Sequence, residues 1–301
     1  MKKRILVSGG TGFIGYHLCK TLVRNNYLVD SLSSKKPKKE KKIKNVNYLI
    51  CDLTNKKKLR RVINKNYEFV INLAGYVNHY EKTKTYNTHY FGCLNLIKCL
   101  KVKNLKLFIQ IGSGLEYGLS KTPHSENLNG KPNSIYAKAK FNASKSVLNF
   151  TKSKSFVAIV LRIYQVYGPG QECNRLIPQV IKACLKNKKF NCTNGIQAKD
   201  FLYIEDLIKL FLLILKNKKN ITNIFNVGYG KPTYIKKIIK KISLMIKGGE
   251  PIFGAIEMRK DEPISMYPNI KKISKFYKWR PKIRLNTGLS RTIKFFKKND
   301  A

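Results

Sequence analysis

The 301-residue sequence is poor in acidic residues, with 16 Asp and Glu against 61 Lys and Arg. It also has no apolar run long enough to cross a bilayer, and Met1-Lys-Lys-Arg leads directly into the first apolar segment. The lack of such a run excludes a membrane-spanning helix, so we expect a soluble, cytoplasmic protein without membrane insertion. The hydrophobic fraction of 43% is enough for the core of one large domain or of two joined domains.

The seven cysteines form neither a Cys-x-x-Cys pair nor a regular disulfide framework. Scattered cysteines of odd number favour neither structural disulfides nor a zinc site. We therefore expect reduced thiols and no bound metal.

The formal charge of +45 would attract polyanions such as nucleic acids. Most of these cations, however, are lysines in short runs, such as those within 35–44 and 236–241. No recognised nucleic-acid-binding motif accompanies them, and the runs are typical of a compositional bias on solvated faces. We expect no specific nucleic-acid partner, whereas nonspecific binding at low salt follows from the charge.

The first half of the sequence alternates short apolar runs with amphipathic stretches. This alternation predicts βαβ units and hence an α/β fold with a doubly wound parallel sheet of the Rossmann type. The expected strands cover residues 5–8, 28–32, 48–51, 69–73, 107–111 and 158–163, and the expected helices cover 13–25, 55–65, 85–103 and 136–153.

The pattern changes after residue 170, where short strands and helices follow without the regular alternation. We expect a smaller C-terminal α/β lobe that binds substrate beside the carboxyl edge of the sheet, where open α/β sheets place their ligands. The predicted domains are 1–164 for the dinucleotide and 165–301 for the substrate. Whether a segment near 195–230 packs back on the Rossmann sheet is left open. Helices are expected at 175–187, at 205–217, from 234 and after 287, with strands at 190–192 and 223–227.

The first apolar run leads into three glycines at Gly-x-x-Gly-x-x-Gly spacing, Gly9, Gly12 and Gly15. In a dinucleotide site the first glycine permits a tight turn, the second lets the backbone approach a pyrophosphate, and the third lets the helix pack on the strand. The N-terminus of the helix then offers N–H groups to the anion. The spacing predicts a dinucleotide site, although a glycine-rich turn alone would also fit a turn that binds nothing.

Tyr136 and Lys140 form a Tyr-x-x-x-Lys pair within a predicted helix. An ordinary tyrosine, with a pKa of about 10, is a weak base at neutral pH. A lysine four residues on lies one helical turn away on the same face, and its charge favours tyrosinate. The spacing therefore pairs Tyr136 with Lys140 and not with Lys138 as a candidate for proton transfer.

Six ordered motifs resemble those of the extended short-chain dehydrogenases/reductases that act on nucleotide-linked sugars, the NAD-dependent epimerase/dehydratase family. They are the glycine fingerprint, Asp52-Leu53, Asn72-Leu-Ala-Gly75, Ile-Gly-Ser113-Gly-Leu-Glu-Tyr117-Gly, Tyr136-x-x-x-Lys140 and Leu161-Arg-Ile-Tyr-Gln-Val-Tyr167-Gly-Pro-Gly170. The resemblance implies a catalytic triad of Ser113, Tyr136 and Lys140. It also implies a homodimer built on the helices expected at 85–103 and 136–153.

The resemblance places Ser33 and Ser34 where NAD-specific members carry an acidic ligand for the ribose. NADP(H) is therefore favoured over NAD, whereas a one-residue shift that used Asp30 would reverse the preference. Asp52 matches an adenine contact, and capping of the following helix is an equally ordinary role for it. The implied cofactor-binding residues are Gly9, Thr11, Gly12, Phe13, Ile14, Gly15, Ser33, Ser34, Asp52, Leu53, Leu73, Ala74, Gly75, Tyr136, Lys140, Tyr164 and Val166.

The neighbours of the triad separate the subfamilies. Gly114 and Leu115 stand where 4,6-dehydratases carry an Asp-Glu pair, and Leu115 and Arg175 replace the Cys and His of GDP-fucose synthases. The stretch Phe-Gly-Ala-x-x-x-Arg259 resembles CDP-abequose and CDP-paratose synthases and related dTDP-4-keto-6-deoxyglucose reductases. The resemblance thus implies an NADPH-dependent 4-ketoreductase for a nucleotide-linked 4-keto-6-deoxyhexose, supplying a deoxysugar for surface polysaccharide. The alternatives are a nucleotide-sugar 4-epimerase with tightly bound NAD and a non-catalytic NADP(H)-binding regulatory module, which the intact triad disfavours.

The substrate, a nucleotide-diphosphate sugar, requires fixed cations. The resemblance assigns substrate contacts to Ser113, Gln165, Arg175, Lys199 and Arg259. Lys199 replaces the usual Arg and so loses a bidentate fork. Gln165 also replaces the usual Asn.

His89 lies where Asn is common in the helix behind the site. A lone histidine is more often a supporting neighbour of a site than a catalyst.

Overall fold

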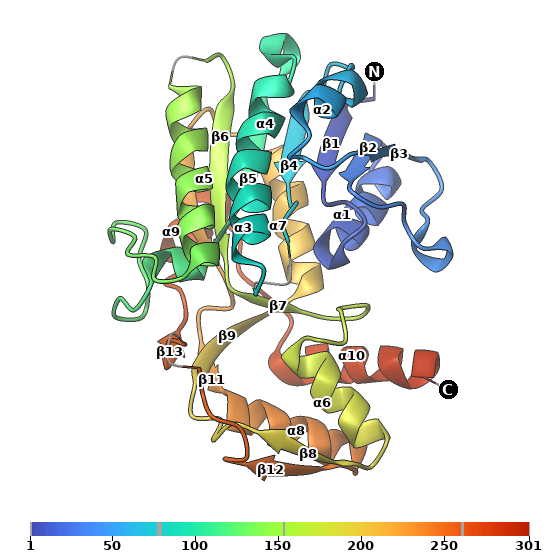
Figure 1. Ribbon diagram of the computed structural model, residues 1–301, viewed down its shortest axis with the longest axis vertical. Helices are drawn as coiled ribbons and strands as arrows, with labels where there is room; N and C mark the ends of the chain where they lie inside the picture. Colours follow the sequence, from blue (N-terminus) through green and yellow to red (C-terminus); the bar gives the residue numbers. More distant parts are fainter. Residues whose placement is uncertain (1, 77–79, 153, 260–261, 301) are drawn as a thin grey trace. The chain divides into compact units, whose positions relative to one another are not determined.

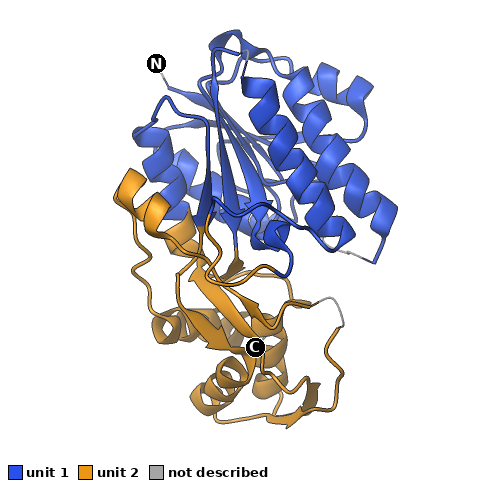
Figure 2. Cartoon of the chain, turned by 90° about the vertical axis from the view of Figure 1, so that its left-hand side faces the viewer, with its two compact units in different colours: residues 1–119, 126–163, 208–226 blue, residues 120–125, 164–207, 227–301 orange. Residues whose placement is uncertain are grey.

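The structure is a computed structural model that describes residues 2–76, 80–152, 154–259 and 262–300. The chain forms two compact units, each drawn from separate stretches of sequence (Figure 2). The first unit holds residues 1–119, 126–163 and 208–226, and the second holds 120–125, 164–207 and 227–301. Their roles in binding cofactor and substrate, and the domain boundary after residue 164, stay predictions.

The first unit is built on a seven-stranded sheet with the order β10-β6-β5-β4-β1-β2-β3. Its strands from β6 to β3 can be followed in Figure 1. The strand pairs from β6 to β3 run parallel. This order confirms the predicted Rossmann-type α/β fold. The strands are β1 Arg4–Ser8, β2 Leu28–Ser33, β3 Val46–Ile50, β4 Phe69–Asn72, β5 Leu107–Ser113, β6 Val157–Ile163 and β10 Asn223–Val227.

Helices cover the sheet because apolar side chains recur on one side of each. A buried cluster joins Leu6, Val70 and Phe108 of the strands to Leu59, Leu96 and Val147 of three helices. That cluster fixes α2, α4 and α5 against one face of the sheet. The helices are α1 Phe13–Arg24, α2 Lys56–Val62, α3 Lys82–Tyr86, α4 Gly92–Cys99, α5 Ile135–Thr151 and α7 Ile204–Lys216, the last entering the first unit at residue 208.

The helix predicted over 85–103 is confirmed as far as Cys99, but it begins at Lys82 and contains a π-helical turn. Its residues form the end of α3, a π-helical turn η2 at Asn87–Phe91, and α4, which stops before Leu100. Leu100 has extended dihedral angles, φ −71° and ψ 141°, and the 3₁₀ turn η3 Val102–Asn104 follows. The π turn inserts an extra residue into the helical repeat, a feature that averaged apolar periodicity does not reveal.

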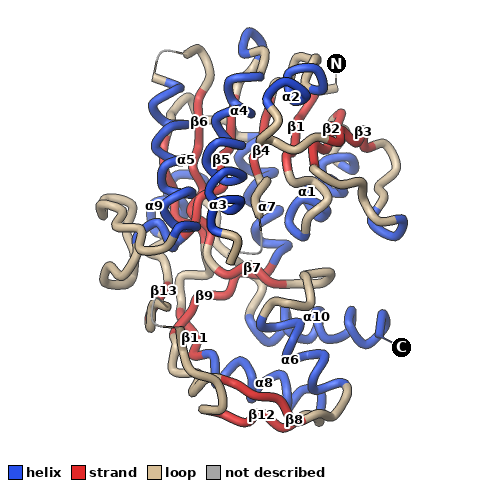
Figure 3. The backbone as a smooth tube through the Cα atoms, viewed as in Figure 1, coloured by secondary structure: helices blue, strands red, loops and turns tan. Residues whose placement is uncertain are grey.

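The second unit holds a small sheet and a separate strand pair (Figure 3). In the sheet, β9 Ala198–Tyr203 pairs with β7 Gln165–Tyr167, β11 Pro232–Tyr234 and β13 Ser265–Met266. The separate pair joins β8 Lys189–Cys192 to β12 Glu250–Phe253. The helices are α6 Leu176–Leu185, α8 Ile235–Ile246, α9 Lys271–Tyr277 and α10 Leu285–Asp300. Within the described ranges, no helix is long and apolar enough to span a membrane.

The register of the first sheet brings the ends of its strands together. Ser8, at the end of β1, pairs with Leu32 of β2 and Asn72 of β4, while Ser113 of β5 pairs with Ile163 of β6. Because these strands are parallel, their carboxyl ends lie along one edge, which is where α/β folds bind ligands.

Candidate active site

The glycine turn after β1 needs its glycines for different reasons. Gly9 has a φ of +73°, and a Cβ there would lie 2.9 Å from Ala74 N. A Cβ on Gly15 would overlap the carbonyl oxygen of Gly9. Gly12 differs, because its Cβ would meet only that oxygen, at 3.4 Å, and otherwise faces open space. The turn is therefore closely packed beneath and open at Gly12, where a ligand could approach the backbone.

Helix α1 starts at this turn with its first N–H groups available. Gly12 is the N-cap residue, no side chain caps the helix, and no acidic residue lies in its first turn. Uncapped N–H groups and the helix dipole favour an anion at such an end. Beside it, the Thr11 N–H donates to Ser33 Oγ at 3.3 Å. Ser33, the last residue of β2, is buried and Ser34 is exposed.

The acidic residue of β2, Asp30, is engaged inside the first unit. Tyr67 donates its hydroxyl proton to Asp30 Oδ2 at 2.7 Å, and Asn47 donates to Oδ1 at 3.1 Å. Arg4 and Lys65 each lie 3.4 Å from the carboxylate, which is 1% exposed. Asp30 also stands three residues before the strand ends, so its carboxylate is committed to these partners.

Asp52 is exposed and holds the turn that follows it. Its Oδ1 accepts from both the N–H and the hydroxyl of Thr54 at 2.8 Å. The cap of α2 is instead Asn55, whose Oδ1 accepts from Lys58 N at 3.0 Å. The alternative that Asp52 caps the helix is therefore wrong, while its adenine contact stays a prediction. Leu53 beside it is buried.

His89 packs between the loop after β4 and Tyr136. Its Nε2 lies 3.2 Å from both the backbone N and the backbone O of Tyr76. Its ring meets the ring of Tyr136 edge-on, with the centroids 5.0 Å apart. A Cβ on Gly75 would overlap the His89 ring, so the glycine after Leu73 and Ala74 is required for this packing. The contacts suit a residue that holds Tyr136 in place.

Helix α5 presents Tyr136, Lys140 and Ser144 on one face, since they are four residues apart. The Lys140 ammonium is 4% exposed and donates to Ile111 O of β5 at 2.8 Å. Burial lowers the pKa of Lys140 to about 8, while the charge of Glu116 acts in the opposite direction. The buried Lys140 therefore lies against the strand that ends in Ser113, and the half-buried Tyr136 lies one helical turn before it on α5.

Ser113 ends β5 and caps the 3₁₀ turn η4 Gly114–Tyr117. Its Oγ accepts from Leu115 N at 3.2 Å, and its own N–H donates to Glu116 Oε1 at 2.8 Å. This reciprocal capping box holds the serine at the carboxyl edge of the sheet. Ser113 and Lys140, two of the three predicted catalytic residues, are thus brought to the last residues of one strand.

In the second unit, Lys199 and Arg259 gather around Glu262. Lys199 Nζ donates to Pro263 O at 2.7 Å and lies 3.4 Å from Glu262 Oε1. Arg259 Nε lies 3.9 Å from Glu262 Oε2. Burial lowers the pKa of the Lys199 ammonium, and Glu262 opposes that shift. Two predicted substrate cations are therefore neighbours, whereas Arg175 lies at the N-cap of α6.

The predicted cofactor and substrate residues at 164–166 form the start of the second unit's sheet. Tyr164 OH lies 2.8 Å from His124 Nδ1, and His124 Nε2 lies 3.1 Å from Ser120 O. Because a carbonyl oxygen only accepts, Nε2 carries the proton and Nδ1 accepts from Tyr164. Gln165 is exposed and Val166 is buried. Their contacts with ligands stay predictions.

The sequence pattern of the NAD dependent epimerase/dehydratase family matches residues 5–228. The chain belongs to this family. The predicted family is thereby confirmed, and the six motifs that indicated it extend from β1 to β7.

Relatives of this epimerase/dehydratase family member cover nearly the whole chain. CDP-abequose synthase of Salmonella typhimurium is 28% identical over 302 residues, covering 98% of each chain. Human dTDP-D-glucose 4,6-dehydratase is 26% identical over 325 residues, covering 99% of this chain and 91% of its own. A crystal structure of UDP-glucose 4-epimerase from Thermotoga maritima with UDP-glucose has a TM-score of 0.92, with 25% identity and coverage of 99% and 100%.

The described residues fit the dinucleotide that the family name implies. The open side of Gly12 and the uncapped start of α1 suit a pyrophosphate. Lys140 donates to Ile111 O, two residues before Ser113, and its contact with ribose hydroxyls stays a prediction. A pyridine nucleotide is the cofactor that this epimerase/dehydratase site accommodates.

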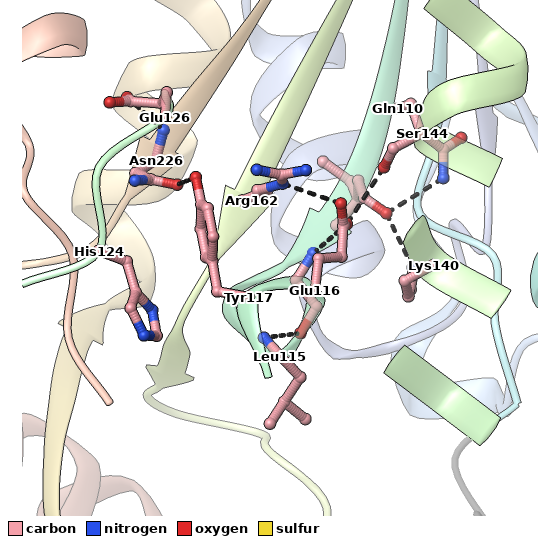
Figure 4. Close-up of polar contacts among 12 residues, drawn as sticks. Gln110, Leu115, Glu116, Tyr117, His124, Glu126, Lys140, Ser144, Arg162 and Asn226 are labelled. Carbon is pink, nitrogen blue, oxygen red and sulfur yellow. Dashed lines mark hydrogen bonds and ion pairs between the residues drawn. The ribbon is translucent and has the colours of Figure 1, made fainter. Parts of the chain in front are cut away.

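One feature of this family member's site was missed by the sequence predictions, a buried ion pair between Glu116 and Arg162 (Figure 4). Arg162 Nε donates to Glu116 Oε2 at 2.8 Å, and the guanidinium lies over the ring of Tyr117, 4.4 Å from its centroid. Two signals could have revealed it. Ser113-x-x-Glu116 has capping-box spacing, and Arg162 interrupts an otherwise apolar strand.

Proposed function

We propose that this protein uses NADPH to reduce the C4 ketone of a nucleotide-linked 4-keto-6-deoxyhexose. The product would supply a deoxysugar for a surface polysaccharide. The observation that carries the proposal is the joint placement of Tyr136 and Lys140 on one face of α5, with Lys140 bonded to β5 two residues before Ser113. This arrangement provides an acid, a fixed cation and a hydroxyl at one edge of the sheet.

The residues act on the C4 oxygen. A bound nicotinamide supplies the hydride that C4 accepts. Tyr136 donates its phenolic proton to the oxygen, and the Ser113 hydroxyl hydrogen-bonds the same atom. Lys140, with a pKa of about 8, is largely protonated at pH 7 and stabilises the tyrosinate that remains. The products are the C4 alcohol and oxidised cofactor.

Two alternatives lack support from the residues beside Ser113 and from the end of β2. Dehydration needs an acid/base pair after the serine, and η4 carries Gly114 and Leu115 there. An epimerase that retains NAD usually has an acidic ribose ligand, whereas Ser33 ends β2 and the carboxylate of Asp30 is held by Tyr67. The first observation disfavours dehydration, and the second favours NADP(H) and net reduction over the rival 4-epimerase.

The substrate's diphosphate would be held by Lys199 and Arg259. Both cations already face a carboxylate, that of Glu262, so an anionic group suits the same position. We further propose Arg175 and Gln165 as contacts to the nucleotide sugar. We also propose a homodimer formed through α4 and α5, the pairing that the family resemblance implies.

Turnover of 4-keto-6-deoxy sugars linked to CDP, dTDP, GDP and UDP, with NADPH and with NADH, tests the proposal. Tyr136→Phe should lower kcat by about 10²- to 10⁴-fold and leave the NADPH dissociation constant unchanged, because it removes only the proton donor. Tyr234→Phe, an exposed tyrosine of the second unit, is the matched control.

Near-normal turnover by Tyr136→Phe would refute the mechanism. Copurified NAD with interconversion of a UDP-sugar in the absence of NADPH would establish the 4-epimerase instead.

A further inference from the structure

Glu116 connects the predicted catalytic serine to the helix that carries the other two catalytic residues. Its Oε1 accepts from the backbone N–H of Ser113 at 2.8 Å and from the hydroxyl of Ser144 at 3.1 Å. Ser144 lies one turn beyond Lys140 on the face of α5 that bears Tyr136. One carboxylate oxygen thus spans from the end of β5 to the catalytic face of α5 (Figure 4).

This carboxylate is fully buried and forms an ion pair. Arg162 of β6 donates to its second oxygen at 2.8 Å and is itself 4% exposed. A buried carboxylate without such a partner would be strongly disfavoured. Arg162 therefore pairs with one oxygen of Glu116, and the other oxygen accepts from the two serines.

The groups that face Lys140 come from three other elements. They are Glu116 on η4, the Cys93 thiol on α4 and the Ile111 carbonyl on β5, while Tyr136 lies one helical turn before Lys140 on α5 and Arg162 pairs with Glu116. Burial raises the pKa of the Cys93 thiol to about 12, so it is neutral at physiological pH. Burial lowers the pKa of Lys140 to about 8, and Glu116 limits that fall.

We propose that Glu116, paired with Arg162, is a positioning residue of this active site. It sets Ser113 against the catalytic face of α5, and its carboxylate favours the charged form of Lys140. The inference rests on the proposed function only for the roles of Ser113 and Lys140. It adds a buried pair that does not touch substrate or cofactor.

The first test measures the NADPH dissociation constant against pH in the Tyr136→Phe protein, where the tyrosine no longer titrates. Affinity should fall as pH rises through about 8, because Lys140 loses its proton there. Adding Glu116→Gln should move this midpoint down, since the carboxylate that opposes the fall in the Lys140 pKa is lost. Glu68→Gln, at an exposed pair with Lys106, should not move it.

A folding control is needed to exclude a loss of NADPH binding that is caused only by unfolding of the variant. Glu116→Gln alone leaves Arg162 buried without its carboxylate. The double variant Glu116→Gln with Arg162→Met removes both charges, a change that buried ion pairs often tolerate. It should unfold at nearly the wild-type temperature and still show the lowered midpoint, which a merely structural role would not produce.

A second readout needs no cofactor. The difference in unfolding free energy between proteins with Lys140 and with Lys140→Met changes over the pH range in which Lys140 titrates. Loss of Glu116 should move that range down by the same amount. An unchanged range in the folded double variant would overturn the inference, even if the wild type reduces its substrate. Conversely, a wild-type protein that binds no NADPH would refute the proposed function. If loss of Glu116 still moves the pH range in which Lys140 titrates, this inference would stand.

Discussion

Lys140 in the first unit and Lys199 in the second are equally buried, at 4% exposure, but they are held in different ways. Each donates to a backbone carbonyl, Ile111 O at 2.8 Å or Pro263 O at 2.7 Å. Lys199 also pairs directly with Glu262, a partly exposed carboxylate. The carboxylate near Lys140, by contrast, is bound by Arg162.

The difference indicates how a buried ammonium group can serve either ligand binding or catalysis. The partner of Lys199 lies at the surface of its unit, 21% exposed, where an anionic ligand could replace it. The carboxylate near Lys140 is buried and paired with Arg162. It therefore influences the pKa of Lys140 without forming a direct ion pair with it. A displaceable partner suits binding, and a fixed one suits catalysis.

The largest expected effect comes from replacing each lysine with methionine, because the two variants should lose different kinetic parameters. Lys140→Met should lower kcat/KM by about 10³-fold and weaken NADPH binding, because the tyrosinate and the ribose lose their cation. Lys199→Met should raise KM for the nucleotide sugar about tenfold, with kcat and NADPH binding retained, since one charge-assisted hydrogen bond is lost. Steady-state kinetics and cofactor titration measure both. Identical kinetic profiles for the two variants would break the comparison.

The next largest effect is on the free energy of unfolding, and the direction of its change with pH follows from the lowered pKa of Lys140. Lys140 has a folded-state pKa of about 8, below the value of about 10.4 for an unfolded lysine. Between these values the unfolded chain binds more protons, so the Lys140 contribution makes the unfolding free energy rise with pH. Below about pH 8 the buried ammonium lowers stability by up to about 3 kcal/mol relative to a neutral group.

Urea unfolding of wild type and Lys140→Met from pH 7 to 10 measures this contribution. The methionine variant should be more stable at pH 7, and its advantage should shrink as pH rises. Lys199→Met should show the same trend with a smaller amplitude, because Glu262 is a direct partner. A constant advantage across the range would contradict the lowered pKa of Lys140.

The smallest expected effect concerns Glu262 and tests whether its carboxylate competes with the substrate's diphosphate. Glu262→Gln should lower KM for the nucleotide sugar about two- to fivefold, because the diphosphate no longer competes with a partly exposed carboxylate. The gain should fade at high salt, where such pairs are screened. Glu250→Gln, which removes the carboxylate paired with Lys189 in the same unit, is the control and should leave KM unchanged. A raised KM in Glu262→Gln would mean that Glu262 orients the cations instead.

The features that could be predicted depend on residues that are close together in the sequence. The βαβ alternation predicted the sheet, and the glycine spacing predicted the turn that Gly9 and Gly15 require. The π turn at Asn87–Phe91 was missed because periodicity averages over an inserted residue. The partner of Glu116 was missed because Arg162 lies on the next strand and is brought close only by the pairing of β5 with β6.

The stripe of Tyr136, Lys140 and Ser144 has a consequence for anyone who would transplant this site into another scaffold. A graft of Ser113, Tyr136 and Lys140 alone would carry the reactive groups without the carboxylate that joins strand to helix. The smallest portable module also includes Glu116, Ser144 and Arg162, and hence the adjacent strand β6. Shuffling that respects this six-residue block should preserve its geometry, whereas a crossover between residues 144 and 162 would separate the carboxylate from its counter-ion.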